Sequence, residues 1–382
     1  MASAYLLKSR ETGDFSNIVK AESALDQSLH LEPDNQFDNQ FGNQSGNGEA
    51  LKLQLILLLT EHRFREGLDL AEQLQSRFPN DSQIETALID AHVELGNYQA
   101  AIATADALIS SCPSAPVYAR RSYLRSLHGN SSAAIADMQK AIKTANPRDH
   151  EGLAWYNVHL GIELLNAGHW AAGEQAIDQA LEVFPNYPIA LSAKARARLS
   201  DQDWQQAVHY YQRSQMQMPL PDTAMALGDL HKHLGDRDAA ERQYDLVDFL
   251  VRSGGEPFEK AYAHQLVLFW ADQEQHLDQA LNLIEQEKMT RSDIYTYDAL
   301  AWCLFKLGRR SQAKEAIDQA LQLHTLDARI YYHAGQIYHS QGEDKKAIQF
   351  LKQALKINPV FHPLQADLAR QVLASLGEQL DF

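Results

Sequence analysis

The stretch ARIYYHAGQIYHSQGEDKKAIQFLKQALKINP, residues 328–359, decides the fold of this chain. Apolar and small residues recur three and four positions apart in each of its halves, which is typical of two amphipathic helices. Gly342 separates the halves, where a left-handed residue ends a helix, and Pro359 stops the second helix. The stretch therefore predicts a helical hairpin.

The hairpin pattern repeats along the chain. Tyr331 and Gly342 occupy the same slots as Tyr297 and Gly308, which lie 34 residues earlier. A repeat of this length predicts stacked hairpins that bury a shared core. Other units begin near residues 48, 82, 115, 154, 188, 221 and 261, so the chain contains about nine units, of which the one near 261 is degenerate.

Period and residue pattern together resemble the tetratricopeptide repeat family over residues 48–359. The resemblance implies an all-α fold, a right-handed superhelical solenoid of about nine hairpins. It also implies a protein-binding scaffold, because first helices in that family line a concave groove that holds a partner segment. The leading function is therefore a non-enzymatic scaffold that binds a protein or peptide partner in its concave groove and serves the assembly of a complex.

Small residues in the pattern have a physical role. Gly161, Gly228 and Gly335 are expected where two helices cross, since larger side chains would hold the helices apart. Another set of glycines is expected to take the left-handed conformation at the ends of first helices: Gly96, Gly129, Gly168, Gly235, Gly308 and Gly342.

Three regions depart from the array. Residues 1–32 predict an N-terminal helical hairpin, and residues 33–47, which repeat Asn-Gln tetrads, predict a flexible loop. Residues 247–260 contain RSGGEP and predict a loop that interrupts the array of residues 48–359. Residues 360–382 predict a final amphipathic helix that caps the last hairpin.

Composition limits the partners and the compartment. A net charge of −16 disfavours phosphate backbones, so we expect no nucleic acid partner. No apolar run is long enough for membrane insertion, and the first residues lack a signal-peptide pattern. We therefore expect a cytoplasmic protein, or a periplasmic one if the chain is a processed form. Cys112 and Cys303 are expected to be reduced.

Motifs of catalytic chemistry are missing from the sequence. It contains no GxSxG, no glycine-rich phosphate loop and no HExxH, and the repeats leave no segment for a catalytic domain. We expect no catalytic residue and no cofactor other than the divalent metal considered next.

Asp229 and His233 are spaced i, i+4, which places them on one side of a predicted first helix. A carboxylate and an imidazole suit a divalent metal such as Mn²⁺ or Zn²⁺. The alternatives are an exposed polar face or a hydrogen bond between repeats. Nine repeats, an Asn/Gln-rich insert and groove His and Asp residues also resemble PratA-like periplasmic assembly factors of cyanobacterial photosystem II. That resemblance implies Mn²⁺ binding and delivery as the alternative function.

The groove slots of the family predict partner-binding residues. Tyr295 and Trp302 are two turns apart on one helix and share a face, with Asp298 between them. Exposed aromatic rings beside charges are typical of peptide-binding surfaces, and the alternative is packing between adjacent repeats. The predicted partner-binding residues are Arg120, Trp155, His159, Arg196, Tyr262, Phe269, Tyr295, Asp298, Trp302, Phe305, Tyr332 and His333.

Overall fold

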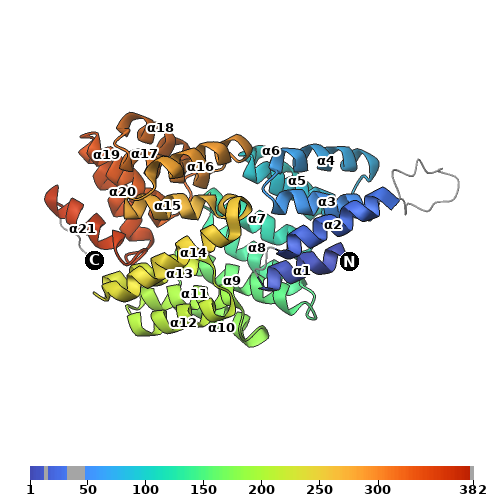
Figure 1. Cartoon of the computed structure of the whole chain (residues 1–382), viewed down its shortest axis with the longest axis horizontal. Coiled ribbons are helices and arrows are strands. Elements are labelled where there is room, and N and C mark those ends of the chain that lie inside the picture. The colour runs from blue at the N-terminus through green and yellow to red at the C-terminus, as the bar shows by residue number, and fades with distance from the viewer. Residues whose placement is uncertain (13–15, 32–47, 379–382) are drawn as a thin grey trace. The chain divides into compact units, whose positions relative to one another are not determined.

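The computed structural model describes residues 1–12, 16–31 and 48–378, and throughout these ranges the chain is built from helices without a β-strand (Figure 1). The predicted all-α solenoid is confirmed. The helices are α1 (Ala2–Thr12), α2 (Ser16–Leu31), α3 (Gly48–Thr60), α4 (Phe64–Arg77), α5 (Ser82–Glu94), α6 (Tyr98–Ser111), α7 (Ala115–Leu127), α8 (Ser131–Thr144), α9 (His150–Asn166), α10 (Trp170–Val183), α11 (Pro188–Ser200), α12 (Trp204–Gln217), α13 (Pro221–His233), α14 (Arg237–Ala261), α15 (Ala263–Gln273), α16 (Leu277–Thr290), α17 (Ile294–Lys306), α18 (Arg310–Ala320), α19 (Ala328–Ser340), α20 (Asp344–Ile357) and α21 (Gln365–Ser375).

The chain divides into two compact units, residues 1–120 and residues 121–382. In the first unit, α1 and α2 form a hairpin that packs on α3 through Ile18, Leu25 and Leu57. The Asn/Gln-rich segment predicted as a loop, residues 33–47, lies outside the described residues.

Some hairpins of the second unit depend on a close crossing of their two helices. In the pair α9 and α10, a Cβ atom added to Gly161 would lie 2.6 Å from Ile177 and 2.9 Å from the carbonyl oxygen of Gly173. A Cβ atom on Gly335 would lie 2.5 Å from Leu351 in the pair α19 and α20. These distances confirm the predicted role of the small residues.

The six glycines expected at the ends of first helices all have positive φ, between 68° and 82°. Gly129 has a second constraint, because an added Cβ atom would lie 2.7 Å from the carbonyl oxygen of His324. The turn after α7 therefore accepts only glycine, for its φ of 68° and for the close approach of another backbone.

The segment predicted as an interrupting loop, residues 247–260, is mostly helical. Two helical stretches of α14 meet at a kink at Gly255, which has φ 63° and ψ −160°, and the second stretch ends at Ala261. The prediction of a loop was wrong because helical residues lie on both sides of this glycine. Before the kink, Val247 and Val251 are one helical turn apart and buried, so the first stretch has an apolar face.

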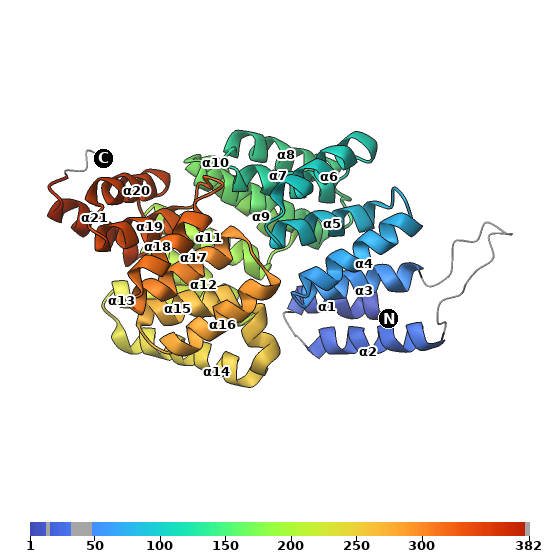
Figure 2. The same ribbon diagram turned by 90° about the horizontal axis from the view of Figure 1, so that it is seen from above.

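The second unit closes on itself. The Thr325 hydroxyl, in the segment before α19, donates a hydrogen bond to the carbonyl oxygen of Leu127, 198 residues earlier. Thr325 is 7% exposed, so this contact between the turn after α7 and the segment before α19 is shielded from water. Consecutive first helices α13, α15, α17 and α19 contact one another (Figure 2), and the side of the second unit that they line is called its inner side below.

We predict that Gly161→Ala lowers the free energy of unfolding by about 1–3 kcal/mol, because the new methyl group would collide with backbone at the helix crossing. Urea denaturation followed by circular dichroism measures the change. The exposed variant Gln175→Ala on α10 is the control and should stay within about 0.5 kcal/mol of the wild type. Equal stability of the two variants would contradict the crossing as a tight constraint.

Candidate functional site

The aromatic residues expected to be exposed in the groove are mostly buried. Trp302 is 2% exposed and Tyr332 3%. The Trp302 ring stacks on Phe305 at 5.1 Å and on His333 at 4.1 Å between ring centroids. The expectation of exposed rings was wrong for these residues, since adjacent first helices α17 and α19 cover them.

Charged residues between these helices are also paired internally. His333 is fully buried, and its Nδ1 lies 2.8 Å from Oδ1 of Asp298, which is 3% exposed. Asp272 on α15 accepts a hydrogen bond from Nε1 of Trp302 at 2.7 Å and one from Nη2 of Arg329 at 2.7 Å. Asp298 is therefore occupied by His333 and is not presented to a partner.

Other predicted aromatic residues of the second unit are buried or half-buried. Tyr262 ends α14 and stacks on Phe258 at 4.7 Å, and burial raises its pKa. Phe269 is 7% exposed and contacts Tyr244 at 5.4 Å. Tyr295 and Phe305 are half-buried, and burial raises the pKa of Tyr295 well above its ordinary value.

Trp155 and His159 lie together on α9, with ring centroids 3.8 Å apart. Burial lowers the pKa of His159 to about 4, so this imidazole is neutral near pH 7 and offers no positive charge to a partner. In the first unit, Arg120 forms a two-pronged ion pair with Asp90 on α5 at 2.7 and 2.6 Å. Arg120 therefore links two repeats.

The two residues predicted to bind a metal have separate partners. Asp229 accepts hydrogen bonds from the hydroxyl of Tyr244 at 2.8 Å and from Nε2 of His362 at 3.0 Å. His233 instead packs on Trp204 with ring centroids 4.7 Å apart. Within the described ranges, no group of three or more His, Cys, Asp or Glu side chains is placed to hold a metal ion. Of the alternatives to metal binding, a hydrogen bond to another part of the array is the one that Asp229 forms.

A cavity of about 360 Å³ lies on the inner side of the second unit, between α11, α13, α15 and the segment after α20. Its walls combine apolar groups such as Met225 and Phe269 with the charges of Arg196, Asp222 and Arg329. The side chains of Arg196 and Asp222 are exposed and form no hydrogen bond or ion pair within the described part of the chain. A ligand in the cavity could therefore reach both charges.

Asp222 has an unusual environment for an exposed carboxyl group. Water reaches the Asp222 carboxyl group, but the side chains that line the cavity limit its hydration. This burial raises its pKa from 3.8 to about 6. Arg329 and Arg196 act in the opposite direction without compensating for this effect. Asp222 therefore changes charge close to neutral pH.

Sequence reasoning missed the segment that follows α20. Residues Phe361, His362 and Pro363 line the cavity together with residues of α11, α13 and α15. The Phe361 ring contacts Tyr332 at 5.6 Å. Periodicity could not reveal this position, because His362 and Asp229 are 133 residues apart. Proline at position 363 was the available sign that this segment leaves the helical pattern.

The sequence profile of the tetratricopeptide repeat family matches residues 53–116, 159–219 and 299–360. The matched ranges lie in both units and coincide with the hairpins described above. The chain belongs to the tetratricopeptide repeat family, whose members bind protein partners and are typically non-enzymatic scaffolds. No curated protein matches the sequence, so the PratA-like resemblance stays a prediction. Across the described helices, none is long and apolar enough to cross a lipid bilayer.

Solved structures share the fold at low identity. A monomeric mutant of human IFIT1 with m7Gppp-AAAA is 10% identical, with a TM-score of 0.51 over 90% of this chain and 78% of that one. Yeast Tom70 is 12% identical, with a TM-score of 0.37 over 100% and 97%. A chain of the APC/C hetero-tetramer Cut9–Hcn1 is 16% identical, with a TM-score of 0.40 over 94% of this chain. This chain spans 60% of the length of that one.

We predict that Trp302→Ala lowers the free energy of unfolding by about 3–5 kcal/mol, because it empties a buried site and leaves Asp272 without one donor. Chemical denaturation measures the loss. Trp302→Phe retains most of the ring volume and should lose less stability than the alanine variant. An alanine variant as stable as the wild type would contradict a packing role for Trp302.

The raised pKa of Asp222 predicts a pH-dependent stability. The folded chain holds this proton up to about pH 6, whereas the unfolded chain releases it near 3.8, so stability falls as pH rises through that window. Asp222→Asn removes the ionised form, so its melting temperature should exceed that of the wild type at pH 8 and match it at pH 4. A difference between the two proteins that does not change with pH would contradict the raised pKa.

Proposed function

We propose that this chain is a non-enzymatic scaffold that holds a short segment of a protein partner in the cavity on the inner side of residues 121–382. The observation that carries the proposal is the pair of free charges, Arg196 and Asp222, in a cavity with apolar walls. Charges in such surroundings gain most from a ligand that replaces their water with hydrogen-bond partners. We propose complex assembly as the purpose of this binding.

Arg196 and Asp222 define what the partner must supply. They lie within electrostatic reach of each other but form no ion pair. A bound segment that places a carboxylate or carbonyl oxygen at Arg196 and an ammonium or guanidinium group at Asp222 would satisfy both. The surrounding side chains of Leu199, Met225 and Leu268 would contact its apolar groups. A polypeptide carries this combination of groups.

The volume limits the length of the segment that the cavity can hold. The cavity has a volume of about 360 Å³, which suits a few residues of a partner chain. A net charge of −16 supports a protein partner over a nucleic acid.

The proposal is tested by charge reversal in the cavity. Arg196→Glu should weaken binding of the partner about tenfold or more, since a charge in a confined site is replaced by its opposite. The partner is first isolated on the immobilised wild-type chain and identified by mass spectrometry. Its affinity for each variant is then measured by titration calorimetry, and cross-links should map to residues around the cavity.

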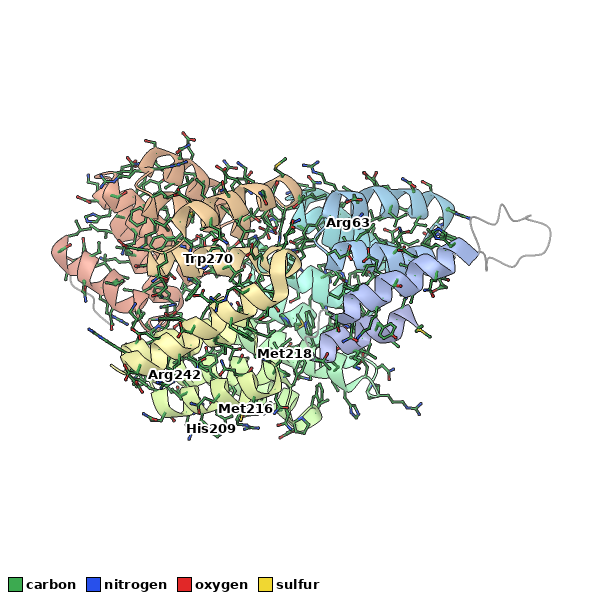
Figure 3. All side chains as sticks on the ribbon, viewed as in Figure 1. Arg63, His209, Met216, Met218, Arg242 and Trp270 are labelled. Carbon is green, nitrogen blue, oxygen red and sulfur yellow. The ribbon has the colours of Figure 1, made fainter. Side chains whose placement is uncertain are left out.

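Arg242→Glu provides a matched control, because it makes the same change on the exposed side of α14, where the label in Figure 3 marks Arg242. This variant should bind the partner like the wild type. Circular dichroism melting curves establish that both variants are folded. If the two reversals weaken binding equally, or if cross-links map only to the outer helices, the cavity is not the binding site.

A further inference from the structure

The segment between α20 and α21 folds back into the inner side of the second unit and subdivides it. His362 and Pro363 line the cavity of about 360 Å³ on one side and a second cavity of about 470 Å³ on the other. A third cavity, of about 580 Å³, is lined by Leu368 and Val372 of the following helix α21. Withdrawal of this one segment would join the first two spaces into a longer groove.

One imidazole ring holds the segment in place and also begins α21. Nε2 of His362 lies 3.0 Å from Oδ2 of Asp229 on α13. Its Nδ1 lies 3.3 Å from the backbone nitrogens of Leu364 and Gln365, so it accepts from the first turn of the helix. The ring therefore donates to Asp229 through Nε2–H. The same ring thus links the first turn of α21 to Asp229 on α13.

Two further contacts hold the segment: one aromatic ring contact and one side-chain hydrogen bond, the kinds of contact that a bound peptide makes. The Phe361 ring packs on Tyr332, and the Gln365 amide donates to Asp272 at 2.9 Å. Burial acts to raise the pKa of Asp229, but the hydrogen bonds from His362 and Tyr244 hold it below its ordinary value. Asp229 is thus an ionised acceptor that requires a donor when it is shielded from water.

We propose that residues 359–365 are an internal competitor for the partner site, and that the partner segment displaces them with the same chemistry. This inference rests on the proposed function. The displacing segment carries an aromatic side chain for Tyr332, followed by N–H donors for Asp229 and Asp272. The chain is then autoinhibited, since its own segment is held beside the site at a high effective concentration.

A synthetic peptide with the sequence INPVFHPLQA, residues 357–366, tests the inference without knowledge of the partner. The protein is the full chain, either as wild type or as the triple variant Phe361→Ala, His362→Ala, Gln365→Ala. A labelled peptide should bind the triple variant at least about tenfold more tightly than the wild type, as measured by fluorescence anisotropy. The wild-type site is occupied, whereas the variant segment has lost its ring and its two donors.

Two controls separate this effect from general loosening of α21. The variant Gln371→Ala changes the exposed side of the same helix and should bind the peptide like the wild type. A peptide with alanine in place of the phenylalanine and histidine should bind none of the proteins. If the triple variant is folded by circular dichroism and binds the peptide no better than the wild type, the inference is overturned.

A second variant covers the case in which the triple variant does not fold. His362→Ala keeps the Phe361 and Gln365 contacts, and it should still bind the peptide about threefold more tightly than the wild type. Its residues 359–365 should also exchange amide hydrogens faster. If this variant shows neither increase, the inference falls.

The outcomes also distinguish this inference from the proposed function. One outcome is that the peptide binds the triple variant while the affinity of the partner is unchanged by Arg196→Glu. This outcome would support the internal competitor and reject the cavity as the partner site. A partner that depends on Arg196 but binds the wild type and the triple variant equally would support the proposed function and reject the competitor. A partner that uses the cavity and has to displace the segment should bind the triple variant about tenfold more tightly.

Discussion

The Thr325 hydroxyl donates to the carbonyl oxygen of Leu127, and Gly129 meets the carbonyl of His324 beside it. This contact joins two turns that are separated by most of the second unit. Through this contact the hairpins of the second unit form one closed superhelical turn, where they would otherwise form an open stack. Within the same unit, Asp222 lines a cavity between α11, α13 and α15, and burial there raises its pKa.

The inner side of the turn contains two kinds of polar group. Buried ones such as Asp298 and His333 are paired across neighbouring helices and fix how those helices stack. Exposed ones such as Arg196 and Asp222 have no such partner. A scaffold needs both a rigid frame and unsatisfied contacts for its ligand, and this division between the groups is the reason for proposing the cavity as the binding site.

The placement of the predicted residues shows what helical spacing can establish. Spacing of seven residues placed Tyr295 and Trp302 on one face of a helix, and the structure has them on one helix, α17. Spacing could not tell what covers that face. Trp302 is covered by Tyr332 and His333 of the next first helix and by Asp272 of the previous one. Arg196, predicted by the same slot rule, remains exposed because α11 borders the cavity.

The sequence by itself determined the hairpins, their period and the glycines at their turns, because these depend on contacts within about one repeat length. Helix ends at Gly308 and Gly342 and the crossing at Gly335 are decided by local backbone geometry and by one neighbouring helix. Only the tertiary structure decided that His362 meets Asp229, 133 residues away, and that Thr325 meets Leu127. Such contacts result from small rotations added over many repeats, and no single repeat contains the information that fixes their sum.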